Sequence, residues 1–557
     1  MNIRYPIYEG VYRILTLKGV LLILALLTFG GLLVAGVVKI LALVCSAVLP
    51  LLEPLIALGL WGSVGYFAYR YFRKKEKPKE EAPEISPELV RLQTTGTPLV
   101  VGNPFRGIFV VGAAGSGKSE SIAVPLLSEF VRLGYSGLVY DFKFPTLAND
   151  VESFLKAERS PVRHVYINFN NPYQSMRVNP ISPRYLLNTS YAREFAQAII
   201  MNLMKEGIRK PDFWIRSATD LLTACIWYLK EEKPECCDIP HVFAMVTGKD
   251  TELLELLQKN PQTEQMTMSI YNAMERGADA QVSGVIGTLQ SAIAQINTPE
   301  LMYIFGGDDF SLDVNNPQNP AILTIGNFPT LAQTFAPLCS LVITVAIKLM
   351  NQPGKHPSFV MLDEAPTIFV PNLEILPNTG RSNHVATVLM CQDLAQLTDG
   401  YGKEKAEVLF AACNTHFYGR VSSSFTAERL SRQFGKEDKI YRTASQSQTG
   451  FYKTTGVSES VQERDTIKPK DFLGFETGEF AGIAVESNRQ FFLLHFLQVV
   501  RPVPAVLEHP QTTGSPNEYY REVREEVRRM LAGQDTKPGN KGEKPEQPLR
   551  RPRFRQG

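Results

Sequence analysis

The chain has 557 residues, more than one hydrophobic core usually organises, so we expect at least two folded units beyond any membrane segment. Charged residues make up 20% of the chain and the formal net charge is +2, so bulk charge neither supports nor excludes a nucleic-acid partner. The seven cysteines form no Cys-x-x-Cys pair and no Cys/His cluster with metal-ligand spacing, so we interpret them, including the adjacent Cys236 and Cys237, as reduced thiols.

The N-terminal part is apolar enough to enter a membrane. Residues 19–38, GVLLILALLTFGGLLVAGVV, carry no charge and are long enough as a helix to cross the roughly 30 Å hydrocarbon core. Residues 40–69 are also apolar apart from one glutamate, and two prolines place a second helix after them or kinked around them. Basic residues flank the pair, so both ends are predicted to be cytoplasmic. The sequence thus predicts a two-helix transmembrane hairpin over residues 1–73, because the apolar stretch is too long for a cleaved signal peptide.

A charged, proline-rich segment, KKEKPKEEAPEISPE, follows the hairpin and predicts an extended linker over residues 74–98. The folded body is then expected to begin near Leu99. A buried strand at 107–112, a glycine-rich turn, a helix at 119–134 and a second strand at 136–142 form a parallel α/β unit.

Over residues 184–305 the apolar residues recur at helical spacing, which predicts an inserted all-α domain. Strand patterns resume after it, so the sheet is expected to be built from both sides of the insertion, from residues 99–183 and 306–507. The tail, residues 508–557, is low in apolar residues, and from Lys537 onward it has seven basic against two acidic residues. Apart from a short amphipathic stretch, we expect this tail to be disordered and basic, either a solvated end or a contact for DNA, lipid or a partner. The predicted strands after the insertion are 321–327, 358–364, 385–392, 480–486 and 490–500.

The glycine-rich turn fits the phosphate-loop pattern G-x-x-x-x-G-K-S/T, and it stands between a strand and a helix as that pattern requires. Its glycines let backbone N–H groups converge on a β-phosphate at the helix N-terminus. Lys118 would reach the β- and γ-phosphates, and the Ser119 hydroxyl would bind Mg²⁺. The predicted nucleotide-binding residues are Gly112, Gly115, Ser116, Gly117, Lys118 and Ser119.

A second set of polar residues follows later strands. Asp363 and Glu364 end the strand SFVMLDE, where Asp363 would hold the Mg²⁺ shell and Glu364 would polarise the attacking water. Gln392 ends the strand VATVLMCQ, a position from which a side chain can sense the γ-phosphate. Arg381 precedes that strand and is predicted to stabilise developing charge in the site of a neighbouring subunit. These carboxylates favour hydrolysis of ATP over simple binding, with Glu364, Gln392 and Arg381 as catalytic candidates and Ser119 and Asp363 as Mg²⁺ ligands.

In combination these residues resemble the coupling-protein ATPases of type IV secretion and conjugation systems. The resemblance runs from the N-terminus to about Pro504, and two features depart from the family pattern. Phe144-Pro145 stands where a Gly-Glu is frequent, and the tail is basic where many members have an acidic tail or a larger domain. The resemblance rests on the hairpin, GAAGSGKS at 112–119, Pro125, DFK at 141–143, RVNP at 177–180, FW at 213–214, LDEA at 362–365, Arg381 and CQDLAQL at 391–397.

The resemblance implies a RecA-like P-loop NTPase core with the inserted all-α domain, assembled as a homo-hexamer under the bacterial inner membrane. Such a protein would connect single-stranded DNA with its relaxase, or effector proteins, to the inner-membrane components of the secretion channel. Two alternatives remain open. One is a membrane-anchored chromosome-segregation translocase, although the tail has no room for the small DNA-reading domain that such proteins carry. The other is a non-catalytic platform that binds ATP and docks secretion substrates, against which Glu364 and Gln392 argue.

Overall fold

The computed structural model describes residues 89–449, 452–504, 507–508, 510 and 514–534, with a few helical positions between residues 25 and 39. The predicted transmembrane hairpin therefore lies almost wholly outside the described residues. The chain divides into two units, Met1–Ile85 and Ser86–Gly557, and the fold described below belongs to the second.

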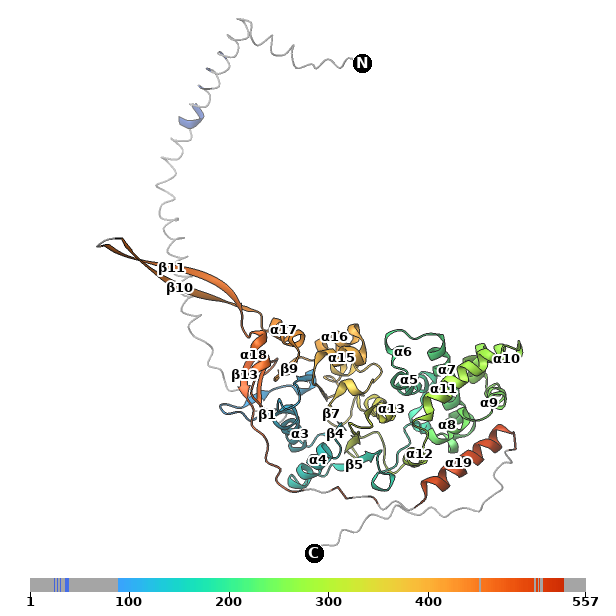
Figure 1. The fold of residues 1–557 in the computed structure, drawn as a ribbon. Helices are drawn as coiled ribbons and strands as arrows, with labels where there is room; N and C mark the ends of the chain where they lie inside the picture. Colours follow the sequence, from blue (N-terminus) through green and yellow to red (C-terminus); the bar gives the residue numbers. More distant parts are fainter. Residues whose placement is uncertain are drawn as a thin grey trace, which may run out of the picture. The chain divides into compact units, whose positions relative to one another are not determined.

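The centre of this unit is a nine-stranded sheet with the order β13-β12-β9-β3-β8-β7-β4-β6-β5 (Figure 1). The seven strands from β9 to β5 run parallel, and β12 and β13 add an antiparallel edge. Two further pairs, β1–β2 and β10–β11, are antiparallel and separate from this sheet. The strands are β1 Val90–Leu92, β2 Leu99–Val101, β3 Ile108–Val111, β4 Ser136–Asp141, β5 Arg163–Asn168, β6 Ala321–Gly326, β7 Ser358–Leu362, β8 Val385–Cys391, β9 Thr415–Tyr418, β10 Lys436–Thr449, β11 Tyr452–Asp465, β12 Glu479–Ala484 and β13 Phe491–His495.

Helices cover both faces of the sheet, which explains why the parallel strands read as continuous apolar runs. In β3, Phe109 and Val111 face one apolar core, while Ile108 and Val110 face the other. The helices outside the insertion are α3 Val124–Arg132, α4 Thr146–Ala157, α13 Ala332–Met350, α14 Ile375–Thr379, α15 Leu394–Tyr401, α16 Lys403–Ala412, α17 Ser424–Gln433, α18 Pro469–Gly474 and α19 Pro516–Leu531. The α/β fold predicted from the sequence is confirmed.

All of the chain between β5 and β6 that forms regular structure is helical, in the region where the sequence predicts an all-α insertion. Helix α5 packs against both α13 of the sheet layer and α7, and so joins the insertion to the α/β part. Figure 1 shows these helices on the right, on the far side of α13 from the sheet. Their bounds are α5 Thr189–Leu203, α6 Glu206–Arg209, α7 Phe213–Glu232, α8 Ile239–Val246, α9 Asp250–Leu257, α10 Pro261–Glu275, α11 Asp279–Ala294 and α12 Pro299–Phe305.

Within the described residues one helix, α13, is long and apolar enough to cross a membrane, by length and composition alone. Most of it is buried: it packs against α5 and β4 in the interior of the fold. Its apolar character is therefore accounted for by the core.

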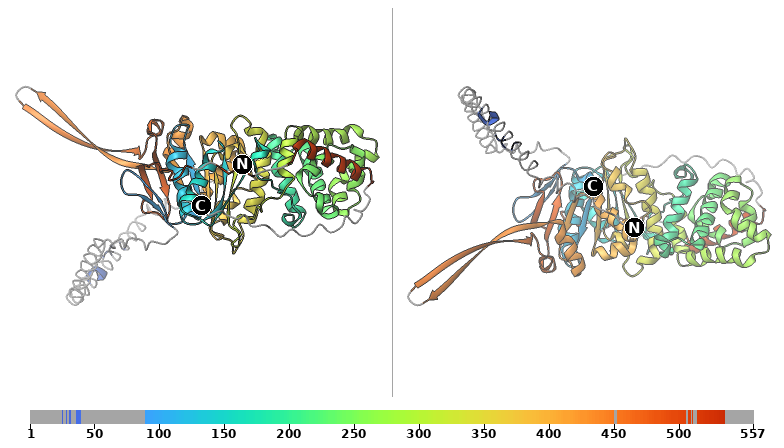
Figure 2. Two further views of the ribbon diagram at one scale, coloured as in Figure 1. Left: turned by 90° about the horizontal axis from the view of Figure 1, so that it is seen from below. Right: turned by 90° about the horizontal axis from the view of Figure 1, so that it is seen from above.

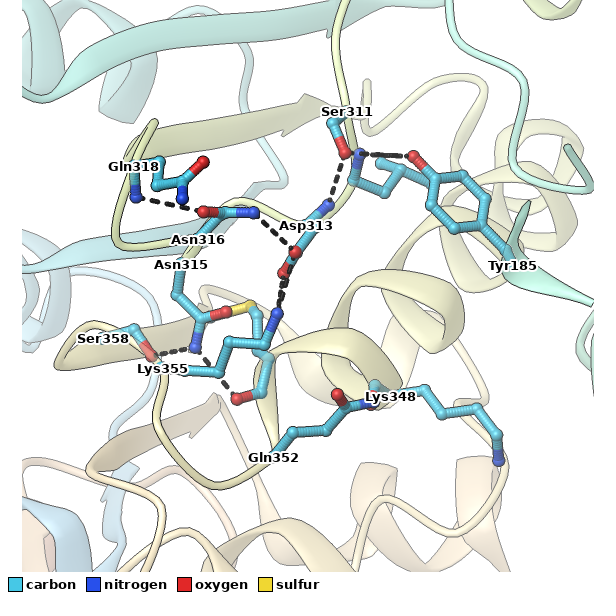
Figure 3. A network of polar contacts seen from close by, with 12 residues as sticks. Tyr185, Ser311, Asp313, Asn315, Asn316, Gln318, Lys348, Gln352, Lys355 and Ser358 are labelled. Carbon is cyan, nitrogen blue, oxygen red and sulfur yellow. Dashed lines mark hydrogen bonds and ion pairs between the residues drawn. The ribbon is translucent and has the colours of Figure 1, made fainter. Parts of the chain in front are cut away.

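The chain re-enters the sheet from the insertion through a polar network (Figure 3). The side-chain amide of Asn315 is buried and donates to the carbonyl of Met350 at 2.9 Å and to the Ser358 hydroxyl at 3.2 Å. Lys355 pairs with both carboxylate oxygens of Asp313 at 2.7 and 2.8 Å. These bonds tie the segment before β6 to the end of α13 and the start of β7, and so fix the two parts of the chain to one another.

The long ribbon β10–β11 projects from the sheet body between α17 and α18 (Figures 1 and 2). Its two 14-residue strands pair with each other from Lys436↔Asp465 to Thr449↔Tyr452. Among its described side chains, Ile440, Val457 and Val461 are exposed.

The structure differs from the sequence expectation at both ends of the folded body. The predicted linker 74–98 contains β1, which pairs with β2 and buries Val90 and Leu92. The tail 508–557, predicted to be disordered apart from a short amphipathic stretch, forms α19 at that stretch, and this helix packs on α8 and α12. Val523 and Val527, with Met530 and Leu531, are spaced to form one apolar stripe, and burial of that stripe holds the helix in place. Residues 535–557, which include the basic cluster, lie outside the described part.

Candidate nucleotide-binding site

The glycine-rich loop leaves β3 at the carboxyl edge of the parallel strands. Gly112 N–H donates to the Cys391 carbonyl at the end of β8, at 3.1 Å, and Ala113 N–H donates to the Arg420 carbonyl at 2.7 Å. Gly115 and Gly117 have φ values of +77° and +90°, in the left-handed region that side chains rarely adopt. The loop is therefore anchored to both neighbouring strands and depends on glycine for its path.

A segment far along the chain braces this loop from the other side. Gly478 N–H donates to the Ser116 carbonyl at 3.0 Å, and the Thr477 hydroxyl donates to the Gly115 carbonyl at 2.8 Å. A Cβ on Gly117 would lie 2.8 Å from the Gly478 nitrogen, so no side chain fits there. The Ser116 hydroxyl is buried and, within the described residues, has no hydrogen-bond partner.

The helix that follows the loop opens with a π-helical turn, Lys118–Ala123, before α3 begins. Val124 N–H donates to the carbonyl of Ser119, five residues back. Pro125 is the physical reason, because it has no N–H for the Ser121 carbonyl and its ring displaces that carbonyl from the ordinary α-helical register. The proline therefore widens the first turn where Lys118 and Ser119 stand.

Lys118 and Glu364 form a buried ion pair in which Lys118 Nζ lies 2.9 Å from Glu364 Oε2. Their side chains are only 9% and 6% exposed. Glu364 Oε1 accepts a hydrogen bond from the backbone N–H of Gln392 at 3.1 Å. The ends of β7 and β8 and the start of the first helix thus meet at one carboxylate.

Two further carboxyl groups stand beside this pair. Burial, together with the charge of Asp363, raises the pKa of Asp141 to about 7, against hydrogen bonds from the backbone N–H groups of Ala148 and Lys143. Burial also raises the pKa of Asp363, while the Lys118 ammonium acts in the opposite direction. Three carboxyl groups in a poorly hydrated site favour a bound cation, which would lower their mutual repulsion.

These residues line one cavity of about 350 Å³. It contains the loop, Lys118, Ser119, Asp363, Glu364 and Gln392, so the structure brings these predicted site residues together. The cavity is lined by Gly112 to Gly115, Gly117 to Glu120, Val124, Asp141 to Lys143, Thr146, Leu147, Asp363, Glu364, Gln392, Thr477 and Gln498.

Arg381 does not belong to this cavity. It is exposed and precedes β8, whose other end carries Gln392, so it lies at the opposite edge of the sheet. Seven strand residues separate the two edges by about 20 Å. Arg381 lies instead near Glu486, which pairs with Arg106. Within one chain it cannot reach the phosphate loop.

Sequence reasoning missed several residues of the site. Thr477 and Gln498 line the cavity although they lie over three hundred residues from the loop. Arg501 pairs with Glu120 at 3.0 Å and with Asp150 at 2.5 Å, and so ties the chain after β13 to the first turn of the helix. No local pattern marks these positions; only the predicted strands 480–486 and 490–500 indicated that this part of the chain returns to the sheet.

The donor set fits a nucleoside phosphate with a hard divalent cation. Loop amides and Lys118 supply hydrogen-bond donors and positive charge. The predicted residue Ser116 does not line the cavity, and its buried hydroxyl has no hydrogen-bond partner within the described residues. Hydroxyl and carboxylate oxygens from Ser119 and Asp363 are the ligand type that Mg²⁺ prefers.

Comparisons with known proteins identify a family and a similar fold. Residues 72–479 match the family model described as type IV secretory system conjugative DNA transfer. The fold is similar to the unbound bacterial conjugative coupling protein TrwBdeltaN70, at 15% identity and a TM-score of 0.57, covering 74% of this chain and 90% of that one. It is similar to the plasmid coupling protein TrwB in complex with ADP and Mg²⁺, at 16% identity and a TM-score of 0.57, covering 75% and 92%.

A third structure, TrwB with the non-hydrolysable ATP analogue ADPNP, gives 16% identity and a TM-score of 0.56, covering 73% of this chain and 89% of that one. Among curated protein sequences, none matches this chain. Because the family model spans nearly three quarters of the sequence, the chain belongs to the type IV secretory system conjugative DNA transfer family.

Proposed function

We propose that the protein is an ATP-hydrolysing coupling protein that recruits DNA–relaxase complexes, effector proteins or both to a type IV secretion channel. The observation that carries the proposal is the buried contact between Lys118 of the glycine-rich loop and Glu364 at the end of β7. Family membership supports a role in conjugative DNA transfer, and this contact supports ATP hydrolysis.

ATP would occupy the 350 Å³ cavity with its phosphates against the loop amides. Lys118 would leave Glu364 and contact the β- and γ-phosphates. Ser119 and Asp363 would hold Mg²⁺, which when bound draws charge from the phosphate oxygens. The structures of TrwB in complex with ADP and Mg²⁺ and with a non-hydrolysable ATP analogue support this pair of ligands.

Glu364 would orient and polarise the water that attacks the γ-phosphate. Its two oxygens are held by different donors, Lys118 Nζ and Gln392 N–H. Departure of Lys118 toward the phosphates would leave Oε2 free to accept a proton from water. The Gln392 N–H would hold the Glu364 carboxylate in its orientation, and loss of the γ-phosphate would change the position of Gln392 and of β8, which it follows.

Arg381 would act on the nucleotide of an adjacent subunit in a homo-hexamer. Its exposed position at the far edge of the sheet is compatible with action across a subunit boundary and incompatible with action in its own chain. The predicted hairpin over residues 1–73 would fix the ring to the bacterial inner membrane, beside the inner-membrane components of the channel.

The proposal is tested by DNA transfer from cells in which the chromosomal or plasmid copy is replaced by a variant. Lys118→Ala should abolish transfer while the protein stays in the membrane at normal abundance, because it removes a phosphate contact. Lys249→Ala is the matched control, since Lys249 is exposed and pairs only with Glu252 of its own helix in the described contacts. Transfer by Lys118→Ala at the level of the control would overturn the proposed motor function.

A further inference from the structure

Three side chains that the nucleotide site does not use converge where α19 crosses the start of α8. Cys236 and His241 come from the turn before α8 and from its first turn, and Glu526 comes from α19. One ligand-type atom from each side chain lies within 4.8 Å of the others. Figure 1 shows α19 running beneath α8 and α12, and these helices are in contact.

The distances in this cluster are those of a metal-binding polyhedron. Cys236 Sγ lies 3.5 Å from Glu526 Oε1, and His241 Nε2 lies 3.6 Å from Glu526 Oε2. Sulfur, nitrogen and oxygen ligands bound to Zn²⁺ at about 2.0 to 2.3 Å in a tetrahedron stand about 3.3 to 3.5 Å apart. The side chains therefore need to move little to share one ion.

Asp238 fixes the orientation of the histidine. Its Oδ1 accepts a hydrogen bond from His241 Nδ1–H at 2.6 Å and from the backbone N–H of His241 at 2.9 Å. The lone pair of Nε2 is consequently directed to the sulfur and carboxylate. A carboxylate that holds the second nitrogen of a metal-bound histidine is a recurring feature of zinc sites.

The histidine is deeply buried, and its inner nitrogen Nε2, 3.6 Å from Glu526 Oε2, makes no hydrogen bond within the described residues. His241 is 6% exposed and Cys236 is 4% exposed. A buried acceptor without a partner is unfavourable, and a cation coordinated by Nε2 would satisfy it.

We propose that Cys236, His241 and Glu526 bind a transition-metal ion of the Zn²⁺ class, with Asp238 as the outer hydrogen-bond partner of the histidine. A thiolate, an imidazole and a carboxylate together select such an ion over Mg²⁺ or Ca²⁺, which prefer oxygen ligands alone. Two anionic ligands neutralise the charge of a divalent ion inside this partly buried site. Three protein ligands leave a fourth position for water.

The site joins segments that are far apart in the sequence, since 290 positions separate Cys236 from Glu526. Helix α19 is already held by its apolar stripe and by Tyr519, which lies edge-on to Tyr303 of α12. An ion at this crossing adds a bond between the C-terminal helix and the all-α insertion. Its removal would loosen α19 without affecting the nucleotide cavity.

The experiment is a cobalt and zinc titration of the full-length, detergent-solubilised protein, reduced and free of nucleotide and Mg²⁺. Co²⁺ bound to a thiolate gives a charge-transfer absorption that oxygen ligands do not give. We expect one such Co²⁺ per chain, displaced by one equivalent of Zn²⁺. Cys236→Ser should lose the absorption, and Asp238→Asn should weaken metal affinity by about 10- to 100-fold.

Two control variants separate the site from its surroundings. Cys237→Ser changes the neighbouring thiol, which donates to the Ile181 carbonyl, and should leave the absorption unchanged. Glu525→Gln changes the adjacent carboxylate, which pairs with Arg528, and should leave the affinity unchanged. Glu526→Gln should weaken binding at least tenfold, and since Glu526 is half-exposed this variant is expected to fold.

The proposal is overturned if the wild-type protein shows no thiolate–cobalt absorption, or if Cys236→Ser and Cys237→Ser titrate alike. It is also overturned if Zn²⁺ protects the chain between α18 and α19 from protease cleavage equally in the wild type and in Glu526→Gln. Protection by Zn²⁺ in the wild type alone, with unchanged nucleotide binding in both, supports it.

Discussion

Lys118 Nζ and Glu364 Oε2 are 2.9 Å apart, and both side chains are largely buried. The pair holds the lysine that a phosphate would need and the carboxylate that an attacking water would need. Removing two such ions from water is costly, and their attraction offsets that cost only while they remain paired. A phosphate that takes the lysine therefore also releases the carboxylate, which links substrate binding to activation of the base.

Glu364→Gln should bind ATP more tightly than the wild type. The amide keeps the shape of the side chain but removes the charge that holds Lys118, so the lysine is free for phosphate. We expect the dissociation constant for a non-hydrolysable ATP analogue to fall severalfold, measured by calorimetry on the full-length protein. Glu428→Gln, on an exposed face of α17, is the control and should bind as the wild type does. Weaker binding by Glu364→Gln than by this control would contradict the competing ion pair.

Arg381 should act in trans across a ring. Neither Lys118→Ala nor Arg381→Ala protein alone should hydrolyse ATP, because one lacks a phosphate contact and the other lacks the arginine. In a ring assembled from both, an Arg381→Ala pocket that faces a Lys118→Ala neighbour has every part, and such an arginine is worth roughly 10³ to 10⁵ in rate in other nucleotide hydrolases. DNA-stimulated ATPase activity of co-assembled variants, with co-assembly checked by a tag, should exceed that of either parent. A flat result in verified mixed rings would argue against this role.

His416 should make the stability of the folded part depend on pH. Burial lowers the pKa of His416 to about 4, although its Nε2–H donates to the Cys413 carbonyl at 2.7 Å. Its Nδ1 is buried and has no hydrogen-bond partner within the described residues, so protonation there is unfavourable. Below pH 6.5 the unfolded chain takes up a proton that the folded chain refuses, and stability falls until about pH 4. The full loss is about 3 kcal/mol.

The measurement is the free energy of unfolding in urea between about pH 7 and pH 4.5. His416→Phe should remove this part of the pH dependence, since a ring at this position packs against Phe410 and Phe109 and carries no charge. His384→Asn, at an exposed position with positive φ, is the control and should retain it. An unchanged pH profile in His416→Phe would show that another group is responsible.

The predicted hairpin gives a topology that can be read with reporters. A reporter fused after Lys75 should be active in the cytoplasm, and one placed near Pro50 should not. The reason is the basic residues on both flanks of the two apolar segments. The reverse pattern, or a cytoplasmic signal at both positions, would exclude a two-span hairpin.

The strands of the parallel sheet were predictable because their apolar runs are bounded by glycine and polar residues, as in β3 and β7. Strands β5, RHVYIN, and β9, THFY, were missed because polar residues interrupt patterns that are already short. The ribbon β10–β11 was missed for a different reason. Its strands are rich in Ser, Thr, Gln and charged residues, and each is paired only with the other, so no buried face imposes an apolar alternation.

At the candidate site, the residues found from sequence are those that belong to local patterns, such as Lys118 in the loop and Glu364 at a strand end. Residues that reach the site through tertiary structure, such as Thr477 and Arg501, have no local signal. The cluster around His241 was missed on the same grounds. Its third member, Glu526, lies in the short amphipathic stretch of the tail, for which the sequence indicated no packing partner.

The role of Glu364 in hydrolysis is tested most directly by measuring bound ATP and released phosphate in the same preparation, for wild-type and Glu364→Gln protein with single-stranded DNA. We expect both proteins to hold ATP, while phosphate release by Glu364→Gln falls by roughly 10² or more, because the amide cannot accept a proton from water. Phosphate release by Glu364→Gln close to the wild-type rate would contradict the assignment of Glu364 and, with it, the proposed mechanism of hydrolysis.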